Sequence, residues 1–385
     1  MGSHGNVSQM GLDCHRNFSR ATARDGAGKV VWRQRLEHAD RTRLREQLRQ
    51  WPKVPVVLEG TFGWSWMSDE LGDAGLDPHL SSSRKVAAWR EARGMAKTNK
   101  RDADLLSELW SEKQNWWEVW LAPREVRDQR ELLRYRTTLV RMQTSVKNRV
   151  HATLHRHGVL HPFGDLFGVA GMKFLQQLAS DDTLRDSSRV TLAGYLKLLG
   201  QVRRQIAAAT RQLKGQVRRS DEGNRWRSLP GVSWVLAYTI LAEVGRIERF
   251  KDGRRLSSYS LLAPIADDSG DEDPGARPVG RHVGHVGRRT LKWAFIAAAR
   301  GAVSKSAFFR AIFDRRTDGG KRDRGRGYIA VARELCRVGY SCVKNGRIYQ
   351  EQRPERMNKK ASDLLVRECV GPDRPLAGAD VVAVR

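Results

Sequence analysis

The beginning of the chain alternates short apolar runs with a turn, which predicts β-strands. The apolar run at residues 10–13 ends in a carboxylate. The runs at residues 18–24 and 29–36 flank the turn at residues 25–28, whose Asp-Gly-Ala-Gly sequence is typical of a β-hairpin.

A helix and a second short strand are predicted to follow the hairpin. Residues 41–51 have helical periodicity, and the β-branched run at residues 54–58 indicates a buried strand that ends at Glu59. Together with the first strand, which ends at Asp13, this order predicts an α/β domain over residues 8–122.

Long helices are predicted for the middle of the chain, residues 123–222. The segment around residues 157–171 contains Gly, His and Pro and indicates a bend between two helices. Apolar positions recur in steps of three and four in the first helix at Leu132, Tyr135, Leu139, Met142 and Val146. They form heptads in the second at Leu192, Leu199, Ile206 and Leu213, with Tyr195, Val202 and Ala209 between them. The heptads predict a helical coiled-coil spacer, in which the helices pair with each other or with another subunit.

The last predicted domain, residues 223–350, is mostly helical. A Leu-Pro-Gly-Val-Ser turn at residues 229–233 precedes an apolar helix at residues 234–244. This arrangement is typical of a helix-hairpin-helix-like element, whose backbone N–H groups around Gly231 face a phosphate. A further helix is expected at residues 328–343, and the tail 351–385 is polar. The fold class is therefore α/β plus α.

The net charge of the chain indicates the kind of partner that it binds. The 385 residues include 70 Lys and Arg against 43 Asp and Glu, which gives a formal net charge of +27. This excess indicates a polyanionic partner, and nucleic acid is the first candidate. The longest apolar stretch, residues 232–244, is well short of the roughly 20 residues that span a bilayer, so no membrane partner is expected.

The sequence predicts a cytoplasmic location. The first ten residues show no signal pattern, and the four cysteines form no C-x-x-C pair. Reduced thiols are therefore expected rather than disulfides or a zinc site.

Acidic residues at element ends suggest metal-dependent chemistry. Asp13 and Glu59 each close an apolar strand, and Asn99 and Asp102 are three residues apart, where a helix would place them on one face. Hard oxygen ligands of this kind suit Mg²⁺, which can activate a phosphodiester. The alternatives are solvated loop carboxylates at Asp13 and Glu59 and helix-dipole charges at Asp102 and Asp104.

One serine follows in an acidic loop that runs into a basic segment. Ser269 lies within Asp-Asp-Ser-Gly-Asp-Glu-Asp, and such a serine is either a turn residue or a nucleophile. The glycines at 280, 284 and 287 lack the Gly-Lys-Ser/Thr ending of a nucleotide-binding loop, so no ATP is implied. His282 and His285 lack further ligands at metal spacing and are interpreted as phosphate or structural contacts.

Regularly spaced cations give candidate nucleic-acid contacts. The cations in the spacer repeat every seven residues along the first helix, and the other cations follow Ser269 in the sequence. The row of cations in the spacer either contacts the nucleic-acid backbone or is an ordinary solvated helix face. The candidates are Arg127, Arg134, Arg141, Arg281, Arg288, Arg289 and Lys292, together with the backbone at Gly231.

In this order the motifs resemble the DEDD transposases of the insertion-sequence one-hundred-ten family. They are Met-Gly-Leu-Asp13, Val-Leu-Glu59-Gly, Lys-Thr-Asn99-Lys-Arg-Asp102-Ala, Leu-Pro-Gly231-Val, Ile-Glu-Arg-Phe250, Ser269-Gly and Gly-Arg-Arg-Thr-Leu-Lys-Trp293-Ala. The resemblance covers about residues 8–350. It implies a RuvC-like ribonuclease H domain, a coiled-coil spacer and a C-terminal transposase domain whose serine joins the metal site of the first domain.

The resemblance also implies roles for individual residues. Asp13, Glu59 and Asp102 match the first, second and fourth acids of a tetrad that binds Mg²⁺, and Ser269 matches a nucleophile that forms a covalent phosphoserine intermediate with DNA. Asn99 stands where the third acid is expected. Its amide oxygen can bind a metal but carries no charge, so metal affinity falls unless Asp104 or another neighbour substitutes. Members of the family act as homo-oligomers, dimers or tetramers, and some use a structured guide RNA.

The sequence thus predicts a DNA transposase or site-specific recombinase of an insertion sequence, associated with the nucleoid when it acts. Two alternatives stay open. One is a RuvC-type metal-dependent nuclease that cuts by water attack, and the other is a catalytically impaired nucleic-acid-binding protein, which Asn99 and the charge of +27 would suit.

Overall fold

A computed structural model describes residues 6–61, 63–95, 99–112, 118–265, 282–283, 287 and 289–351. The chain divides into two compact units, and the division lies between Arg124 and Glu125. Among the described residues, no helix has the length and apolar character needed to cross a bilayer.

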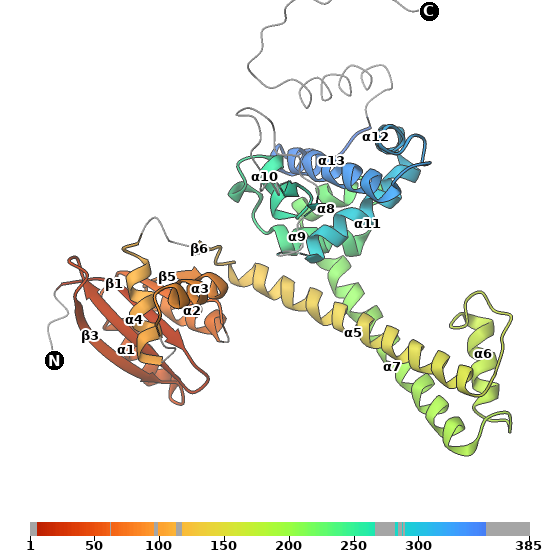
Figure 1. The fold of residues 1–385 in the computed structure, drawn as a ribbon, viewed down its shortest axis with the longest axis horizontal. Coiled ribbons are helices and arrows are strands. Elements are labelled where there is room, and N and C mark those ends of the chain that lie inside the picture. The colour runs from red at the N-terminus through yellow and green to blue at the C-terminus, as the bar shows by residue number, and fades with distance from the viewer. Residues whose placement is uncertain are drawn as a thin grey trace, which may run out of the picture. The chain divides into compact units, whose positions relative to one another are not determined.

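The first unit is built on a mixed six-stranded sheet (Figure 1). Its strands run in the order β3-β2-β1-β4-β5-β6 across the sheet. The hairpin strands β2 and β3 are antiparallel to their neighbours, β1 and β4 are parallel, as are β4 and β5, and β6 is antiparallel to β5. The strands are β1 (Val7–Cys14), β2 (Phe18–Asp25), β3 (Val30–Glu37), β4 (Pro55–Glu59), β5 (Asp77–Ser81) and β6 (Glu118–Val119).

Helices cover both faces of this sheet. On one face, α1 (Arg41–Arg49) and α2 (Trp64–Asp73) share a core with apolar side chains such as Leu12 and Leu58. On the other face, α3 (Ser83–Ala92) and α4 (Asn99–Leu109) enclose Val57. The unit therefore has three layers, and the two residues that precede Asp13 and Glu59 in their strands, Leu12 and Leu58, point to the α1 and α2 side.

Close packing brings α4 against β1. A Cβ atom on Gly11 would lie 2.1 Å from the Ser107 backbone nitrogen and 2.6 Å from the Ala103 carbonyl oxygen, so only glycine fits at this crossing. Because side chains alternate along a strand, Asp13, two residues after Gly11, faces the α4 side as well.

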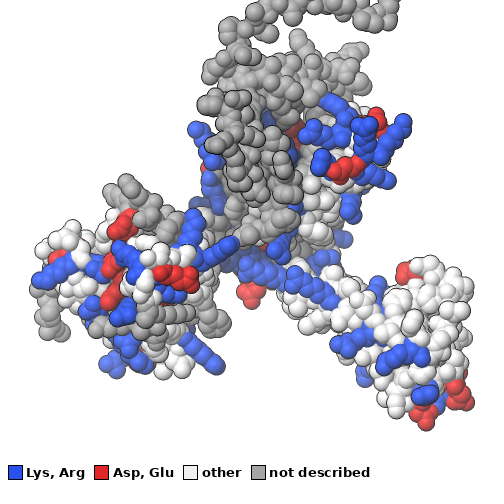
Figure 2. All heavy atoms as spheres, viewed as in Figure 1, with Lys and Arg blue, Asp and Glu red and all other residues white. Residues whose placement is uncertain are grey.

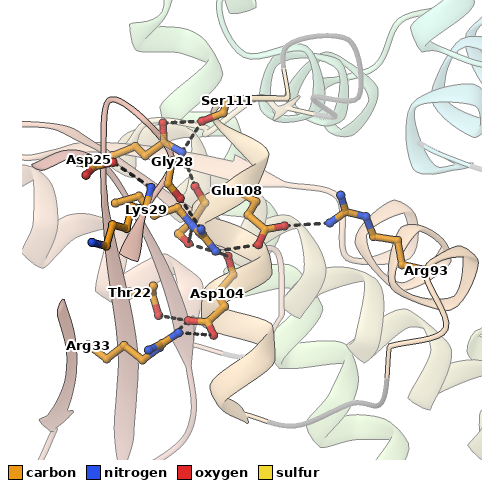
Figure 3. A network of polar contacts seen from close by, with 12 residues as sticks. Thr22, Asp25, Gly28, Lys29, Arg33, Arg93, Asp104, Glu108 and Ser111 are labelled. Atoms are coloured by element: carbon orange, nitrogen blue, oxygen red, sulfur yellow. Dashed lines mark hydrogen bonds and ion pairs between the residues drawn. The ribbon is translucent and has the colours of Figure 1, made fainter. Parts of the chain in front are cut away.

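A polar network fastens α4 to the hairpin (Figure 3). The Thr22 hydroxyl donates to Asp104 at 2.8 Å, and the Arg33 guanidinium donates to both Asp104 carboxylate oxygens at 2.9 and 3.0 Å. One turn further along α4, Arg24 donates to Glu108 at 2.7 Å. These contacts fix the rotation of α4 about its own axis.

The second unit combines a pair of long helices with a compact helical bundle (Figure 1). Its described helices are α5 (Arg124–Arg156), α6 (Val169–Leu178), α7 (Asp186–Arg219), α8 (Asp221–Ser228), α9 (Trp234–Val244), a 3-10 turn (Ile247–Arg249), α10 (Gly253–Tyr259), α11 (Arg289–Lys305), α12 (Ala307–Thr317) and α13 (Arg324–Lys344). The short strands β7 (Pro264–Ile265) and β8 (His282–Val283) pair antiparallel.

Helices α5 and α7 pair with each other in antiparallel orientation. The hydroxyl of Tyr135 lies 3.1 Å from Gln205, and Arg136 donates to Thr210 at 3.0 Å. Near the far end, α6 packs on the pair, and Val150 and Leu192 belong to one core there. The chain therefore leaves along α5 and returns along α7 within this unit.

The bundle is organised around α9, whose residues from Leu236 to Val244 are all buried. Arg130 of α5, itself buried, donates to the Ala242 carbonyl at 2.9 Å and to the Glu243 carbonyl at 3.1 Å. A guanidinium therefore caps the carbonyl end of α9, where the helix dipole favours a cation.

Much of the predicted pattern is confirmed by these elements. The hairpin, α1, β4, α5, α7 and α9 lie where the sequence predicts them, and buried α7 residues include the heptad positions Leu192, Leu199 and Leu213. The predicted apolar stripe of α5 is wrong in part, because Tyr135 and Met142 are 47% and 50% exposed.

Candidate active site

Two predicted acids lie side by side at the ends of parallel strands. Leu12 of β1 is paired with Leu58 of β4, so the next residues, Asp13 and Glu59, reach the same edge of the sheet. Asp13 is only 7% exposed and Glu59 is half-buried. The parallel pairing thus brings together two carboxylates that are 46 residues apart in the sequence.

The first turn of α4 lies toward the same edge. Gln9 donates to the Ser107 carbonyl at 2.6 Å, near the end of α4, whereas Gly11 packs against Ala103. Because α4 thus runs opposite to β1, its first turn, with Asn99 and Asp102, lies on the Asp13 side. Asp102 is 7% exposed, while the Asn99 side chain lies outside the described part of the structure.

Each of the two buried carboxylates has a cationic or imidazole neighbour. The Nε2 atom of His15 lies 3.0 Å from an oxygen of Asp13. The Arg90 guanidinium of α3 donates to an oxygen of Asp102 at 3.1 Å, and both side chains of this pair are largely buried. Any cation that binds Asp102 therefore competes with Arg90.

Asp104 is bound by side chains of the β-hairpin. Burial alone would raise the pKa of Asp104, but the hydrogen bonds and charge of Arg33 and the bond from Thr22 hold this pKa below its ordinary value. Its carboxylate is directed at the hairpin, away from the first turn of α4 (Figure 3). Asp104 is a structural tether between α4 and β2–β3.

The donor types suit a hard divalent cation, since carboxylate and amide oxygens are the ligands that Mg²⁺ prefers. Among the described residues, however, no three His, Cys, Asp or Glu side chains are grouped closely enough to hold a metal ion. The backbone thus brings the elements together, while His15 contacts Asp13 and Arg90 contacts Asp102.

The predicted nucleophile, Ser269, lies outside the described residues, as do Arg281, His285 and Arg288. The strand residue His282 is described without its side chain. These five positions stay predictions.

The remaining predicted nucleic-acid contacts are spread over the second unit. Arg134 and Arg141 are exposed on α5, where Arg127 is half-buried. On α11, Arg289 is exposed, and burial lowers the pKa of the half-buried Lys292. Of the three cations with seven-residue spacing on α5, two, Arg134 and Arg141, are therefore exposed to solvent.

Gly231 is held against α11. A Cβ atom there would lie 2.1 Å from the Ala298 carbonyl oxygen, and the residue has a positive φ of 79°. Its lack of a side chain thus serves helix packing, and a phosphate contact through its backbone stays a prediction.

A denser group of cations lies at the α12–α13 turn, outside the predicted nucleic-acid contacts. Asp318, Gly319 and Gly320 have positive φ values of 53°, 65° and 89° there, and a Cβ on Gly327 would lie 2.4 Å from a Thr317 methyl group. The tight crossing presents six exposed cations, Arg315, Arg316, Lys321, Arg322, Arg324 and Arg326. Figure 2 shows Lys and Arg gathered over this end of the bundle.

Sequence reasoning missed His15 and Arg90. Arg90 belongs to α3, a helix that was not expected, and its ion pair joins residues 12 positions apart in two different helices. No local spacing marks such a pair. His15, two residues beyond Asp13, could have been noted as a neighbouring titratable group.

Two family models match this chain. The DEDD transposase model matches residues 10–158 and so spans Asp13, Glu59, Asn99 and Asp102. The model of the transposase IS116/IS110/IS902 family matches residues 223–314, which include Ser269. The stretch between the two matches contains α6 and the whole of α7.

Individual proteins are similar over much of the chain. The transposase for insertion sequence element IS1111A of Coxiella burnetii is 24% identical over 320 residues, which are 80% of this chain and 84% of that protein. The transposase for IS1328 of Yersinia enterocolitica is 24% identical over 67% of this chain and 74% of its own length. The uncharacterized 44.8 kDa protein of IS116 of Streptomyces clavuligerus is 26% identical over 37% of this chain and 35% of that protein.

Proposed function

The chain belongs to the IS110 family of transposases and is an enzyme that cleaves and rejoins DNA, and we propose that Asp13, Glu59, Asp102 and Ser269 carry out this reaction. One observation supports the proposal most directly. The parallel register of β1 and β4 and the opposite direction of α4 bring three acids far apart in the sequence to one edge of one sheet. The sheet, an antiparallel hairpin continued by parallel strands, also supports a RuvC-like ribonuclease H fold.

The proposed metal ligands are Asp13, Glu59 and Asp102, assisted by the Asn99 amide oxygen. A divalent cation such as Mg²⁺, when bound there, would polarise a phosphodiester and stabilise its leaving oxygen. Binding requires Arg90 to release Asp102, and it brings the carboxylates closer together than they lie in the described structure.

Ser269 is proposed to act as the nucleophile. Its Oγ loses its proton and forms a bond to phosphorus while one P–O bond of the DNA backbone breaks, and the leaving deoxyribose oxygen takes up a proton to become a hydroxyl. One phosphate ester replaces another, so the reverse attack by a deoxyribose hydroxyl rejoins DNA without ATP. The reaction thus exchanges strands without a net loss of ester bonds.

Covalent capture tests this role. The Ser269→Ala protein should form no covalent adduct with DNA of the element ends in denaturing electrophoresis, whereas the Ser304→Ala control, which changes an exposed serine of α11, should form it. An adduct that persists in Ser269→Ala would refute the role of Ser269.

Metal binding is tested separately from activity. Titration calorimetry with Mg²⁺ or Mn²⁺ should show a binding event that is lost in Asp13→Asn and retained in Asp77→Asn. Asp77 is exposed at the start of β5 and serves as the control. Equal binding by both variants would place the metal elsewhere.

Two other activities are distinguished by the same proteins. A RuvC-type nuclease would still cut DNA after Ser269→Ala and lose cutting after Asp13→Asn. The uncharged Asn99 and the Arg90–Asp102 pair favour a third candidate, a binding protein with impaired catalysis. That protein would bind DNA with a steep salt dependence and give no strand transfer with added metal.

We further propose that the enzyme acts as a homo-oligomer, a dimer or a tetramer. Exposed apolar side chains on the long helices, Tyr135, Met142 and Leu198, support contacts between copies. A structured guide RNA is proposed on the family resemblance alone, and co-purified RNA of defined sequence would reveal it.

A further inference from the structure

A row of charged residues crosses the sheet at the level of Asp13. Asp13 of β1 is paired with Arg20 of β2, which is paired with Arg35 of β3. Directly paired residues of antiparallel strands point to the same face, so all three side chains lie on the face that α4 covers in part. Strands are about 4.8 Å apart, so the row extends roughly 10 Å from Asp13.

Aromatic contacts fix the two arginines. The guanidinium carbons of Arg20 and Arg35 lie 5.9 and 3.9 Å from the centre of the Phe18 ring. The same ring packs against His15, with ring centres 4.6 Å apart, and His15 in turn contacts Asp13. Such contacts hold cations in place without neutralising them.

A small open cavity lies over this row. It has a volume of about 90 Å³, and its lining includes Arg20, Thr22, Arg33, Arg35 and Ala103 of α4. One water occupies about 30 Å³ in the liquid, so the cavity has the size of a small polyatomic anion. It opens beside the first half of α4, the part that carries Asp102.

Two of the three arginines that line the cavity have a carboxylate partner, and Arg20 differs from them. Asp104 binds Arg33, and Glu37 binds Arg35 through Nε. The buried Nε of Arg20, in contrast, has no hydrogen-bond partner among the described residues. Asp13, its partner across the strands, is contacted by His15. An anion in the cavity would satisfy Arg20.

From this arrangement we infer that Arg20, supported by Arg35, binds a backbone phosphate of the DNA strand that lies across Asp13. The inference rests on the proposed function, which supplies DNA as the polyanion. Arg20 acts as a positioning residue: its phosphate is a neighbour of the one that reacts, and the contact sets the register of the strand at the carboxylates. Neither the motifs nor the family resemblance pointed to this arginine.

Footprinting on the wild-type protein tests the contact without any mutation. An arginine-selective dicarbonyl reagent is applied to the full chain, with and without duplex DNA of the element end and without divalent metal, and the modified peptides are measured by mass spectrometry. DNA should slow the modification of Arg20 severalfold. The rate at Arg43, exposed on α1 on the opposite face of the sheet, should not change. Equal rates at Arg20 with and without DNA would overturn the inference.

Salt dependence gives an independent measurement. Arg20→Gln should reduce the slope of log K against log salt concentration by about 0.9, the value for one lost phosphate contact. Arg20→Lys should retain the slope, and Arg43→Gln should match the wild type. An unchanged slope in Arg20→Gln, or protection of Arg20 by RNA and not by DNA, would contradict DNA binding at this cavity.

The outcome is separable from that of the proposed function. Loss of the serine adduct in every protein, with Arg20 still protected by DNA, would refute the chemistry and leave the phosphate contact intact. An adduct that forms normally while Arg20 stays unprotected would refute the phosphate contact alone.

Discussion

At the scale of single residues, the candidate site depends on residues that are not proposed to take part in the chemistry. Gly11 sets the distance between β1 and α4, Asp104 sets the rotation of α4, and Arg90 holds Asp102, a proposed metal ligand. Substitutions at these positions test how the structure around the site is held, without changing the residues proposed to react.

Gly11→Ala should destabilise the first unit. The added methyl group would meet backbone atoms of α4 that cannot turn aside, and overpacking of this kind costs typically 1–3 kcal/mol. Urea unfolding measures the loss, and Mg²⁺ titration should show weaker binding because α4 carries Asp102. Gly26→Ala is the control, since a Cβ there has no atom within 4 Å. Equal stability of the two variants would contradict the close crossing.

Asp104→Asn should lower stability by about 1–3 kcal/mol at neutral pH, because it removes the charge that binds Arg33. The Asp104 pKa is lowered in the folded protein. Its contribution is therefore complete above the unfolded-state pKa, near 3.9, and is lost as the pH falls through the folded-state pKa. Urea unfolding at several pH values should show the difference between variant and wild type shrinking below about pH 4. A difference that stays constant to lower pH would contradict the ion pair.

At the scale of elements, the sequence predicted those with a single clear period. The β-hairpin, β4, α7 and α9 follow from alternation, a β-branched run, heptads and an apolar run. Helix α3 was missed because only Val86 of its ten residues is fully buried, which leaves little period to detect. The exposed Met142 shows that an apolar residue in the periodic pattern need not be buried against the partner helix.

The candidate site was predictable only in its residue types. Asp13 and Glu59 could be placed at strand ends, but their proximity depends on β1 and β4 being parallel neighbours, a pairing that joins distant segments. The role of Asp104 was not predictable, since Thr22 and Arg33 come from the hairpin. Long-range pairing carries no local signature.

Arg130→Met tests the contact between α5 and α9. The change keeps an apolar stem but leaves two buried carbonyls of α9 without their donor, which should cost at least about 2 kcal/mol. Thermal and urea unfolding of the full chain measure this loss. Arg134→Met, at an exposed position of the same helix, should stay within about 0.5 kcal/mol of the wild type. A similar small effect at Arg130 would contradict the capping.

At the scale of the whole molecule, a net charge of +27 should make DNA binding strongly salt-dependent. The α12–α13 turn concentrates this charge, and within the described part of the chain its Arg316, Lys321, Arg322 and Arg324 form no ion pair.

Replacing Arg316, Lys321, Arg322 and Arg324 with Gln should reduce the slope of log K against log salt by up to about 0.9 for each phosphate that they contact. Fluorescence anisotropy at several salt concentrations measures the slope. Four exposed cations of α5 and α7 that are not among the predicted contacts, Arg149, Lys197, Arg204 and Arg211, give a control of equal charge. Equal slopes for the two variants would show that the turn has no special part in binding.

The antiparallel pairing of α5 and α7 makes the length of the spacer adjustable. Because the chain goes out and comes back, removing seven residues from each helix at matched positions would retract the α6 end by about 10 Å and preserve the heptad phase on both sides. Helix α7 would still enter the bundle at the same position. A single seven-residue deletion would instead shift one helix against the other by two turns. Equal deletions in α5 and α7 can therefore shorten the spacer without changing how the two helices join the bundle.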